Sequence, residues 1–228
     1  MTFTYNNIVF PELESITAEN GERVYFTPDG QKYPSITTVL SGDPAKQDIL
    51  RAWRERVGEE KAASISRIAS TRGTKIHSLM ESYVLRNQIP DNRIMPPDMR
   101  TFKQIQRAID GHLSVVIGNE APMYSHKLKI AGRADLIGIW DNDCAIIDFK
   151  TSLRTKREEW IGDYFIQTTA YSLMYEELRD MACSKVVVII ACDDTQEAQV
   201  FVRNREEYVA PLKDRIDAFY SRRNSIAA

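Results

Sequence analysis

Apolar residues recur at helical spacing over several long stretches of the chain, and each stretch predicts an amphipathic helix. The first begins after Asp43-Pro44, an N-cap followed by the residue favoured at the first helical position, and its apolar positions include Ile49 and Trp53. Gly73 separates the second stretch from the third. The predicted helices cover residues 44–57, 59–69, 74–84, 99–117, 160–178 and 206–222.

Elsewhere the apolar period changes to two, which predicts strands. The turn signal Pro28-Asp29-Gly30 lies in the N-terminal part, where we expect a small strand pair. The predicted strands lie within residues 6–10, 23–26, 122–129, 130–140, 144–150, 185–191 and 198–203, with a loop at 88–97. Helices followed by strand-strand-strand-helix-strand predict a single α/β domain with a largely mixed sheet.

The composition of the chain excludes several classes of protein. The 228 residues are 43% hydrophobic and 27% charged, which is enough for one sizeable core without disulfides. No apolar stretch reaches the roughly 20 residues that cross a bilayer, and no basic and apolar leader opens the chain, so we expect an intracellular protein without membrane contact. The net charge of −2 gives no global basic field, so binding of nucleic acid must depend on local patches.

Three cysteines, Cys144, Cys183 and Cys192, stand 39 and 9 residues apart, without any close pair. An iron–sulfur cluster needs four thiolates, so this count argues against such a cofactor. We expect all three cysteines to be small buried residues on strands.

Two carboxylates lie at positions where half-buried strands normally carry apolar residues. If Asp141-Asn142 forms a two-residue hairpin loop, Trp140 pairs with Asp143. The same register places Asp135 opposite Asp148, with Cβ atoms about 5 Å apart. Like charges so placed destabilise a hairpin, whereas a divalent cation between them reverses the sign of the effect. The pair therefore indicates a metal site for Mg²⁺, Mn²⁺ or Ca²⁺.

Lys150 follows Asp148 by two residues, so both side chains leave the strand on the same face. A metal held by the carboxylates lowers the pKa of a bound water, and a nearby ammonium orients that water or stabilises a phosphorane-like transition state. A surface ion pair is the alternative for an isolated Asp-x-Lys. The acid on the neighbouring strand favours the catalytic interpretation.

Two helical stripes carry further polar residues at four-residue spacing. Gly73, His77 and Glu81 form one stripe, and Gln167 and Tyr171 form the other. A lone histidine beside an apolar face is more often a packing residue, and each of these residues taken alone would be structural.

Four short motifs follow one another in a fixed order: Gly73-Thr74-Lys75-Ile76-His77, Gly132-Arg133-Ala134-Asp135, Asp148-Phe149-Lys150-Thr151-Ser152 and Gln167-Thr168-Thr169-Ala170-Tyr171. In this order they resemble the RecB-like branch of the PD-(D/E)XK nucleases, over residues 72–191. Within the branch, residues 33–40 and the Asp-Phe-Lys-Thr-Ser run look like phage exonucleases and the mitochondrial genome maintenance exonuclease. The resemblance implies a restriction-endonuclease-like αβββαβ core with a central mixed sheet and an added N-terminal helical region.

The resemblance also implies boundaries and roles. The chain is expected to form one nuclease domain, with a strand pair and helices at 1–70, the nuclease core at 71–203 and a C-terminal helix at 204–228. Lys150 would be the catalytic lysine, and Gln167 and Tyr171 would place it and contact the DNA backbone. The implied metal ligands are His77, Asp135, Asp148 and the backbone carbonyl of Phe149. Glu81 and Glu120 are candidate auxiliary acids, and an ordinary charged surface residue is an equally good interpretation of Glu120.

The implied cofactor is Mg²⁺ or Mn²⁺, without an iron–sulfur cluster, because cluster-bearing relatives carry four flanking cysteines. Residues on both sides of the site offer donors for phosphates, contacts that carry no sequence information. The candidate phosphate contacts are Thr151, Ser152, Arg154, Lys156 and Arg157 after the site, and Arg67, Arg72 and Lys75 before it. A solvated helix face is the alternative for each.

Three aromatic residues, Trp53, Tyr83 and Trp160, are candidates either for base stacking or for the core. The helical region at 44–88 resembles the helices that form an arch over the site in related exonucleases. The resemblance therefore implies a metal-dependent DNA exonuclease acting on single strands or DNA ends. It would serve replication, recombination or DNA processing in the cytoplasm of a bacterial or phage-infected cell, beside a helicase, recombinase or single-strand-binding protein.

Two alternatives stay open: a structure-specific or sequence-specific endonuclease, and a catalytically silent nucleic-acid-binding module. Carboxylate and histidine ligands bind metal only when deprotonated, so activity is expected to fall towards pH 6 as His77 gains a proton. A preference for Mn²⁺ over Ca²⁺ is expected because a nitrogen ligand suits Mn²⁺ better.

Overall fold

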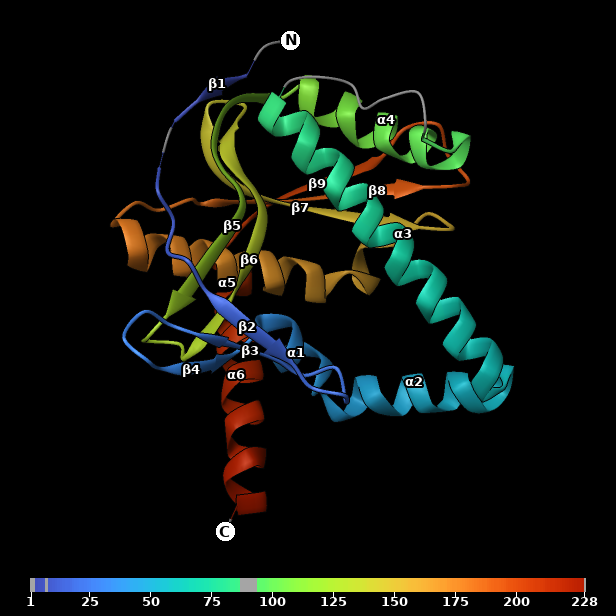
Figure 1. Ribbon diagram of the computed structural model, residues 1–228, viewed down its shortest axis with the longest axis vertical. Helices are drawn as coiled ribbons and strands as arrows, with labels where there is room; N and C mark the ends of the chain where they lie inside the picture. The colour runs from blue at the N-terminus through green and yellow to red at the C-terminus, as the bar shows by residue number, and fades with distance from the viewer. Residues whose placement is uncertain (1–2, 7, 87–93, 228) are drawn as a thin grey trace.

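The computed structural model describes residues 3–6, 8–86 and 94–227 (Figure 1). Its centre is a six-stranded mixed sheet in the order β1-β5-β6-β7-β8-β9. The strands are β1 (Thr4–Tyr5), β5 (Leu113–Ser125), β6 (Ile130–Trp140), β7 (Asp143–Ser152), β8 (Lys185–Cys192) and β9 (Gln199–Asn204). Neighbouring strands are antiparallel except β1–β5 and β7–β8, which are parallel. The predicted α/β class with a mixed sheet is confirmed.

Helices cover both faces of this sheet (Figure 1). One face packs against α3 (Glu59–Arg86) and α4 (Pro96–Asp110), and the other packs against α1 (Ile36–Ser41), α5 (Gly162–Arg179) and α6 (Glu206–Ala227). A short 3₁₀ turn, Glu158–Trp160, precedes α5, which connects the parallel pair β7 and β8. In the part of the chain that the structure describes, no helix has the length and apolar content to span a bilayer.

A second, three-stranded sheet consists of β2 (Glu14–Thr17), β3 (Arg23–Phe26) and β4 (Lys32–Pro34). The predicted small strand pair at the Pro28-Asp29-Gly30 turn is confirmed, because β3 and β4 pair on either side of this turn. The predicted strand at 6–10 was wrong, because residues 6 and 8–10 lie outside strands, and residue 7 lies outside the described residues. A bridge between Ser35 and Ala131 joins the small sheet to β6, so it lies beside the central sheet.

Two predicted helix boundaries were also wrong. Helix α3 continues through Gly73, because a glycine inside a helix costs only about 1 kcal/mol and the following turns are anchored by buried Ile76 and Met80. Helix α4 ends at Asp110, and β5 begins at Leu113 rather than at Pro122. A continuous apolar run does not distinguish a buried strand from a helix.

The predicted loop at 88–97 falls only partly within the described residues. Residues 88–93 lie outside the described residues, whereas Pro96 and Pro97 already belong to α4. Helix α1 was not predicted. Its N-cap is Ser35, whose side chain accepts the Thr38 backbone N–H.

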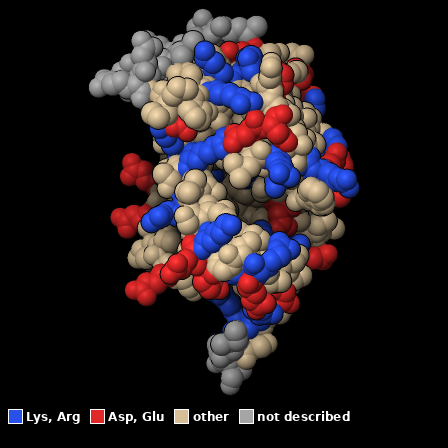
Figure 2. All heavy atoms as spheres, turned by 90° about the vertical axis from the view of Figure 1, so that its right-hand side faces the viewer, with Lys and Arg blue, Asp and Glu red and all other residues tan. Residues whose placement is uncertain are grey.

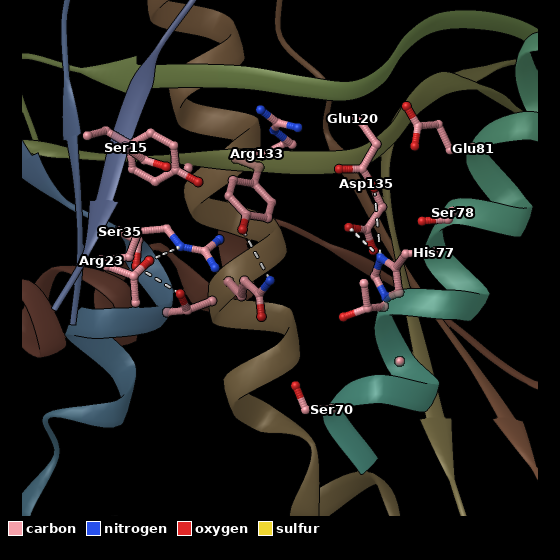
Figure 3. A pocket seen from close by; sticks show the side chains of 18 of the residues that line it. Ser15, Arg23, Ser35, Ser70, His77, Ser78, Glu81, Glu120, Arg133 and Asp135 are labelled. Atoms are coloured by element: carbon pink, nitrogen blue, oxygen red, sulfur yellow. Dashed lines mark hydrogen bonds and ion pairs between the residues drawn. The ribbon is translucent and has the colours of Figure 1, made fainter. Parts of the chain in front are cut away.

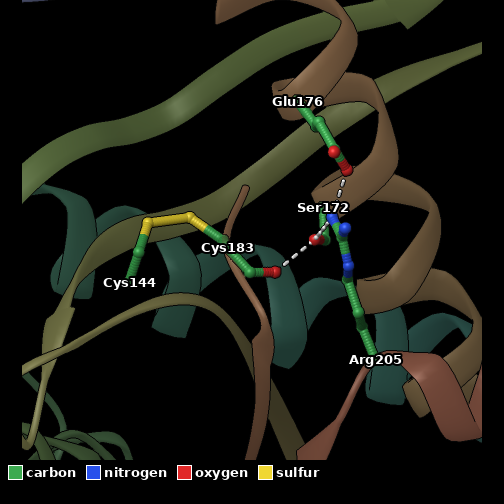
Figure 4. Close-up of a disulfide and its surroundings, with 5 residues drawn as sticks. All are labelled: Cys144, Ser172, Glu176, Cys183 and Arg205. Atoms are coloured by element: carbon green, nitrogen blue, oxygen red, sulfur yellow. Dashed lines mark hydrogen bonds and ion pairs between the residues drawn. A yellow bond between two sulfur atoms is a disulfide. The ribbon is translucent and has the colours of Figure 1, made fainter. Parts of the chain in front are cut away.

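The cysteine prediction was wrong for two of the three residues. Cys144 of β7 and Cys183, in the loop before β8, form a disulfide with a Cα–Cα distance of 4.6 Å (Figure 4). The 39-residue separation is closed by the parallel pairing of Ala145 with Lys185, which brings the preceding residues of both strands together. Only Cys192, buried at the end of β8, matches the expectation.

Candidate active site

The candidate site lies where β6 and β7 diverge. Asp141 and Asn142 have positive φ angles of 46° and 73°, the backbone of a two-residue type I′ loop. The predicted register is confirmed from Trp140–Asp143 up to Leu136–Ile147, where the ladder ends. Asp135 and Asp148 are the next residue on each strand. They therefore stand at the point of divergence and not within the paired ladder.

A backbone donor fixes the orientation of Asp135. The Phe149 N–H donates to Oδ2 of Asp135 at 2.7 Å, so β7 holds a carboxylate that belongs to β6. The other oxygen, Oδ1, lies 3.3 Å from Nδ1 of His77 on α3. The predicted stripe on α3 therefore meets the strand acids, with His77 adjacent to Asp135.

Glu120 belongs to the same cluster, although the sequence indicated it only as an auxiliary acid. The pairs Asn119–Leu136 and Ala121–Ala134 bracket Glu120 and Asp135, which face each other across β5 and β6. The Glu120 backbone has a φ of 48°, a strained conformation for a non-glycine residue of the kind that clusters at functional sites. Its Oε1 lies 3.9 Å from Nδ1 of His77. Register arithmetic from the turn at 126–129, between Ser125 and Ile130, would have found this position.

Lys150 and Asp148 form the second half of the cluster. The Lys150 ammonium lies 2.5 Å from Oδ2 of Asp148, a carboxylate whose side chain is only 1% exposed. Gln167 Nε2 donates to Oδ1 of Asp148 and to the Tyr171 hydroxyl, both at 3.2 Å. The Tyr171 ring lies so close to Gly132 that a Cβ there would be 2.6 Å from a ring carbon. The glycine is needed because the ring occupies the space of a side chain.

The charges of the cluster shift the pKa values of its groups. Burial alone lowers the pKa of His77, but the carboxylates of Asp135 and Glu120 outweigh it and raise the value to about 10. Burial alone would raise the pKa of Asp135, but the contact with His77 outweighs it, and the pKa is lowered. His77 is therefore a cation and Asp135 an anion at neutral pH.

Burial and the charge of Asp135 raise the pKa of Asp148 to about 6, although Lys150 opposes this change. Burial lowers the pKa of Lys150, but the charges of Asp148 and Asp135 outweigh it, so the pKa is raised and the ammonium stays protonated. Burial holds the pKa of Tyr171 well above its usual value, which keeps the phenol a donor.

These side chains open into a pocket of about 850 Å³ (Figure 3). Helix α3 forms one wall, and the small sheet forms the other. Seven predicted site residues line it directly: His77, Glu81, Glu120, Asp135, Lys150, Gln167 and Tyr171. Figure 2 shows the face that includes α3, which is hollowed near its centre, with Lys and Arg side chains around the hollow.

The predicted phosphate contacts lie outside this pocket. Arg72 is bound to Asp193 and Thr101, and Lys75 pairs with Asp98, so both side chains dock α3 onto neighbouring elements. The contacts predicted after the site lie at the end of β7 and in the connection to α5, and they do not line the pocket: Thr151, Ser152, Arg154, Lys156 and Arg157.

The candidate stacking residues differ from one another. Tyr83 is 3% exposed and donates to Asp110, so it is a core residue. Trp160 is 65% exposed and has the Arg157 guanidinium over its ring. Trp53 is half-buried on α2 (Pro44–Val57).

The residues present fit a divalent cation. Single ligand atoms of His77, Glu120 and Asp135 all lie within 4.8 Å of one another. Carboxylate oxygens suit Mg²⁺, and the added imidazole nitrogen suits Mn²⁺. Glu120 is therefore a further candidate ligand beside those that the sequence indicated, which are His77, Asp135, Asp148 and the Phe149 carbonyl.

The fold and the site together are those of a nuclease of the restriction-endonuclease-like class. The family model of the PD-(D/E)XK nuclease superfamily matches residues 91–222, more than half of the chain. The chain belongs to the PD-(D/E)XK nuclease superfamily, as the four motifs predicted.

Two solved structures match the chain at low identity. An exonuclease candidate from Eubacterium rectale has 11% identity and a TM-score of 0.45, over 68% of each chain. An alkaline exonuclease from Laribacter hongkongensis has 10% identity and a TM-score of 0.36, over 83% of this chain and 85% of that chain. No curated protein matches the sequence.

Proposed function

We propose that this protein is a metal-dependent DNA exonuclease that hydrolyses phosphodiester bonds of single strands or DNA ends. The observation that carries the proposal is the convergence of His77, Glu120 and Asp135 with the Lys150–Asp148 pair at one end of a polar pocket. Such a set combines oxygen and nitrogen ligands with a fixed positive charge, which phosphoryl transfer requires.

Each residue has a distinct role in the proposed reaction. His77, Glu120 and Asp135 would hold Mg²⁺ or Mn²⁺, with Asp148 adjacent to them. When bound, the metal supplies a water of lowered pKa and neutralises charge on the phosphoryl oxygens.

The other groups act on the phosphate and on the geometry. The Lys150 ammonium stabilises the charge that develops on the phosphate. The Phe149 N–H fixes the Asp135 carboxylate, and Gln167 fixes the carboxylate of Asp148. These contacts exist before substrate arrives, so little reorganisation is needed during the reaction.

The walls of the pocket favour cleavage at the free ends of DNA strands. One wall is α3, the opposite wall is the small sheet, and both belong to one continuous part of the chain that α2 connects. A strand in this pocket is bordered by that segment on two sides, and a free end enters such a site more easily than a closed circle does.

Outside the pocket, Thr151, Ser152, Arg154 and Lys156 would contact phosphates of the same strand. We place this activity in DNA replication, recombination or processing, where a helicase, recombinase or single-strand-binding protein supplies single strands.

The substitution Asp148→Asn tests the proposal. It keeps the shape of a buried side chain and removes the charge that Lys150 and Asp135 face. We expect cleavage of a labelled linear single strand with Mg²⁺ to fall by at least about 10²-fold. The matched control is Asp214→Asn, an exposed carboxylate on α6, which should cleave as the parent does. Equal cleavage by both variants would contradict the proposal.

A further inference from the structure

The pocket has two chemically different ends. The acids and His77 occupy the end near α3, whereas the wall from the small sheet and α1 carries hydroxyl groups and Arg23. Arg133 of β6 also lines the pocket, and Figure 3 shows it between the acid cluster and the side where Ser15 lies. No sequence motif had drawn attention to Arg23.

The backbone of Arg23 is fixed on both sides. Its N–H donates to Oγ1 of Thr38 at 2.8 Å, and its carbonyl accepts the Ser35 N–H at 2.8 Å. The guanidinium Nε donates to Oγ1 of Thr17, its cross-strand partner, at 3.3 Å. The side chain therefore starts from a fixed position and keeps its terminal nitrogens available.

Arg133 stands two residues before Asp135 on β6, and side chains two apart leave a strand on the same face. Both arginines are exposed. Across residues 3–6, 8–86 and 94–227, neither guanidinium forms an ion pair with a carboxylate, in contrast to Arg72, which is paired with Asp193.

We propose that Arg23 and Arg133 form a phosphate-binding site that holds a backbone phosphate next to the one at the acid cluster. The proposal rests on the proposed function. The planar fork of an arginine matches phosphate oxygens in a bidentate manner, and the hydroxyls of Ser15, Thr17 and Thr37 add neutral donors beside it. Because these groups bind the backbone, the site holds the strand without selecting its sequence.

Binding of a fluorescent single strand to the full-length Asp148→Asn protein with Mg²⁺ tests this site without cleavage. Arg23→Ala and Arg133→Ala should each weaken binding about tenfold at low salt. Each should also reduce the slope of log K against log salt by about 0.7, the value for one lost phosphate contact on a single strand. Lys103→Ala, which removes an exposed cation on α4, should change neither quantity.

A series of strands with one neutral methylphosphonate each locates the phosphate. Neutralising the contacted position should weaken binding by the parent more than binding by Arg23→Ala, because only the contact with Arg133 is left to lose in the variant. Arg23→Lys should restore most of the salt slope.

Three results separate the possible failures. Unchanged affinity and slope in both alanine variants, with normal binding by the parent, would overturn this site and leave the proposed function standing. Loss of the Mg²⁺-induced rise in melting temperature in the same variants would also overturn it, because the arginines would then act on the metal end. Absence of DNA binding by the parent would overturn both proposals.

Discussion

The β6–β7 hairpin and the N-terminal arm, residues 44–71, both have amphipathic sequences, but they are buried to very different extents. Leu136 and Ile147 of the hairpin are 0% exposed. In the arm, Ile49 and Ile68 are 70% and 64% exposed, and α2 has no buried residue. An apolar stripe therefore specifies burial only where another element provides a partner surface. We therefore expect chemistry and stability to depend on the hairpin and its neighbours, and not on the apolar residues of the arm.

The largest expected effect concerns the charge at the centre of the hairpin. Lys150→Met should lower the rate of DNA cleavage by roughly 10²–10³-fold, because it removes a preorganised positive charge that neither region can replace. Lys103→Met on α4 is the matched control and should retain the parent rate. Single-turnover cleavage measures the effect, and near-UV circular dichroism checks the fold. A parent-like rate for Lys150→Met would show that the charge of Lys150 is not needed for cleavage and would contradict its proposed role.

A second prediction compares the part of α3 that belongs to the arm with the part of α3 that packs on the central sheet. Ile76 and Ile68 both lie on α3, at 0% and 64% exposure. Ile76→Ala should lower the free energy of unfolding by about 2–5 kcal/mol, because it leaves a cavity against the sheet. Ile68→Ala should change it by no more than about 0.5 kcal/mol. Urea unfolding gives both values, and similar losses in the two variants would show that the arm is buried after all.

The third prediction concerns the contact between Gly132 and Tyr171. Gly132→Ala should destabilise the protein by about 1–3 kcal/mol, because the new Cβ and the Tyr171 ring need the same space. Its cleavage rate should fall as well, since Tyr171 supports Gln167. Gly111→Ala is the control, because a Cβ there meets nothing closer than 3.7 Å. Thermal unfolding and cleavage are measured on both, and an unaffected Gly132→Ala would contradict the close packing.

The last prediction concerns the dependence of stability on pH. The folded pKa of His77, about 10, lies above its unfolded value of about 6.5, so the folded state holds more protons between these values. The stabilisation is complete below pH 6.5 and is lost as the pH rises through 10. The melting temperature in EDTA should therefore fall over this range, and His77→Gln should remove that part of the fall. An identical profile in parent and variant would contradict the raised pKa.

Metal affinity depends on the proton of His77 as well, but it should rise with pH where the stability falls. Because His77 must lose its proton to bind a cation, the apparent Mg²⁺ affinity should rise with pH below 10. This agrees in direction with the expected loss of activity towards pH 6, and it extends the dependence to alkaline pH.

The sequence predicted the β6–β7 hairpin well because its information is local. Alternating apolar residues defined β6 as 130–140, and the Asp141-Asn142 turn set the register that brings Asp135 and Asp148 to the same point. Helix α2 was likewise predicted from its cap, Asp43.

The remaining features depend on contacts between distant parts of the chain. The role of Glu120 follows from its position across β5–β6, and the start of β5 follows from pairing that an apolar run alone does not reveal. The Cys144–Cys183 disulfide requires the parallel β7–β8 pairing. The apolar stripe of the arm does not indicate whether another element covers it, so the exposure of Ile49 and Ile68 could not be predicted from the sequence.

Exonuclease action is tested by digestion of one end-labelled linear single strand and of the same sequence closed into a circle, each with Mg²⁺, Mn²⁺ or EDTA. We predict that only the linear strand is shortened, only with metal, and the position of the label then gives the polarity. Cutting of the circle would show an endonuclease, and no cutting of either substrate would contradict the assignment of His77, Glu120, Asp135 and Lys150 as a catalytic cluster.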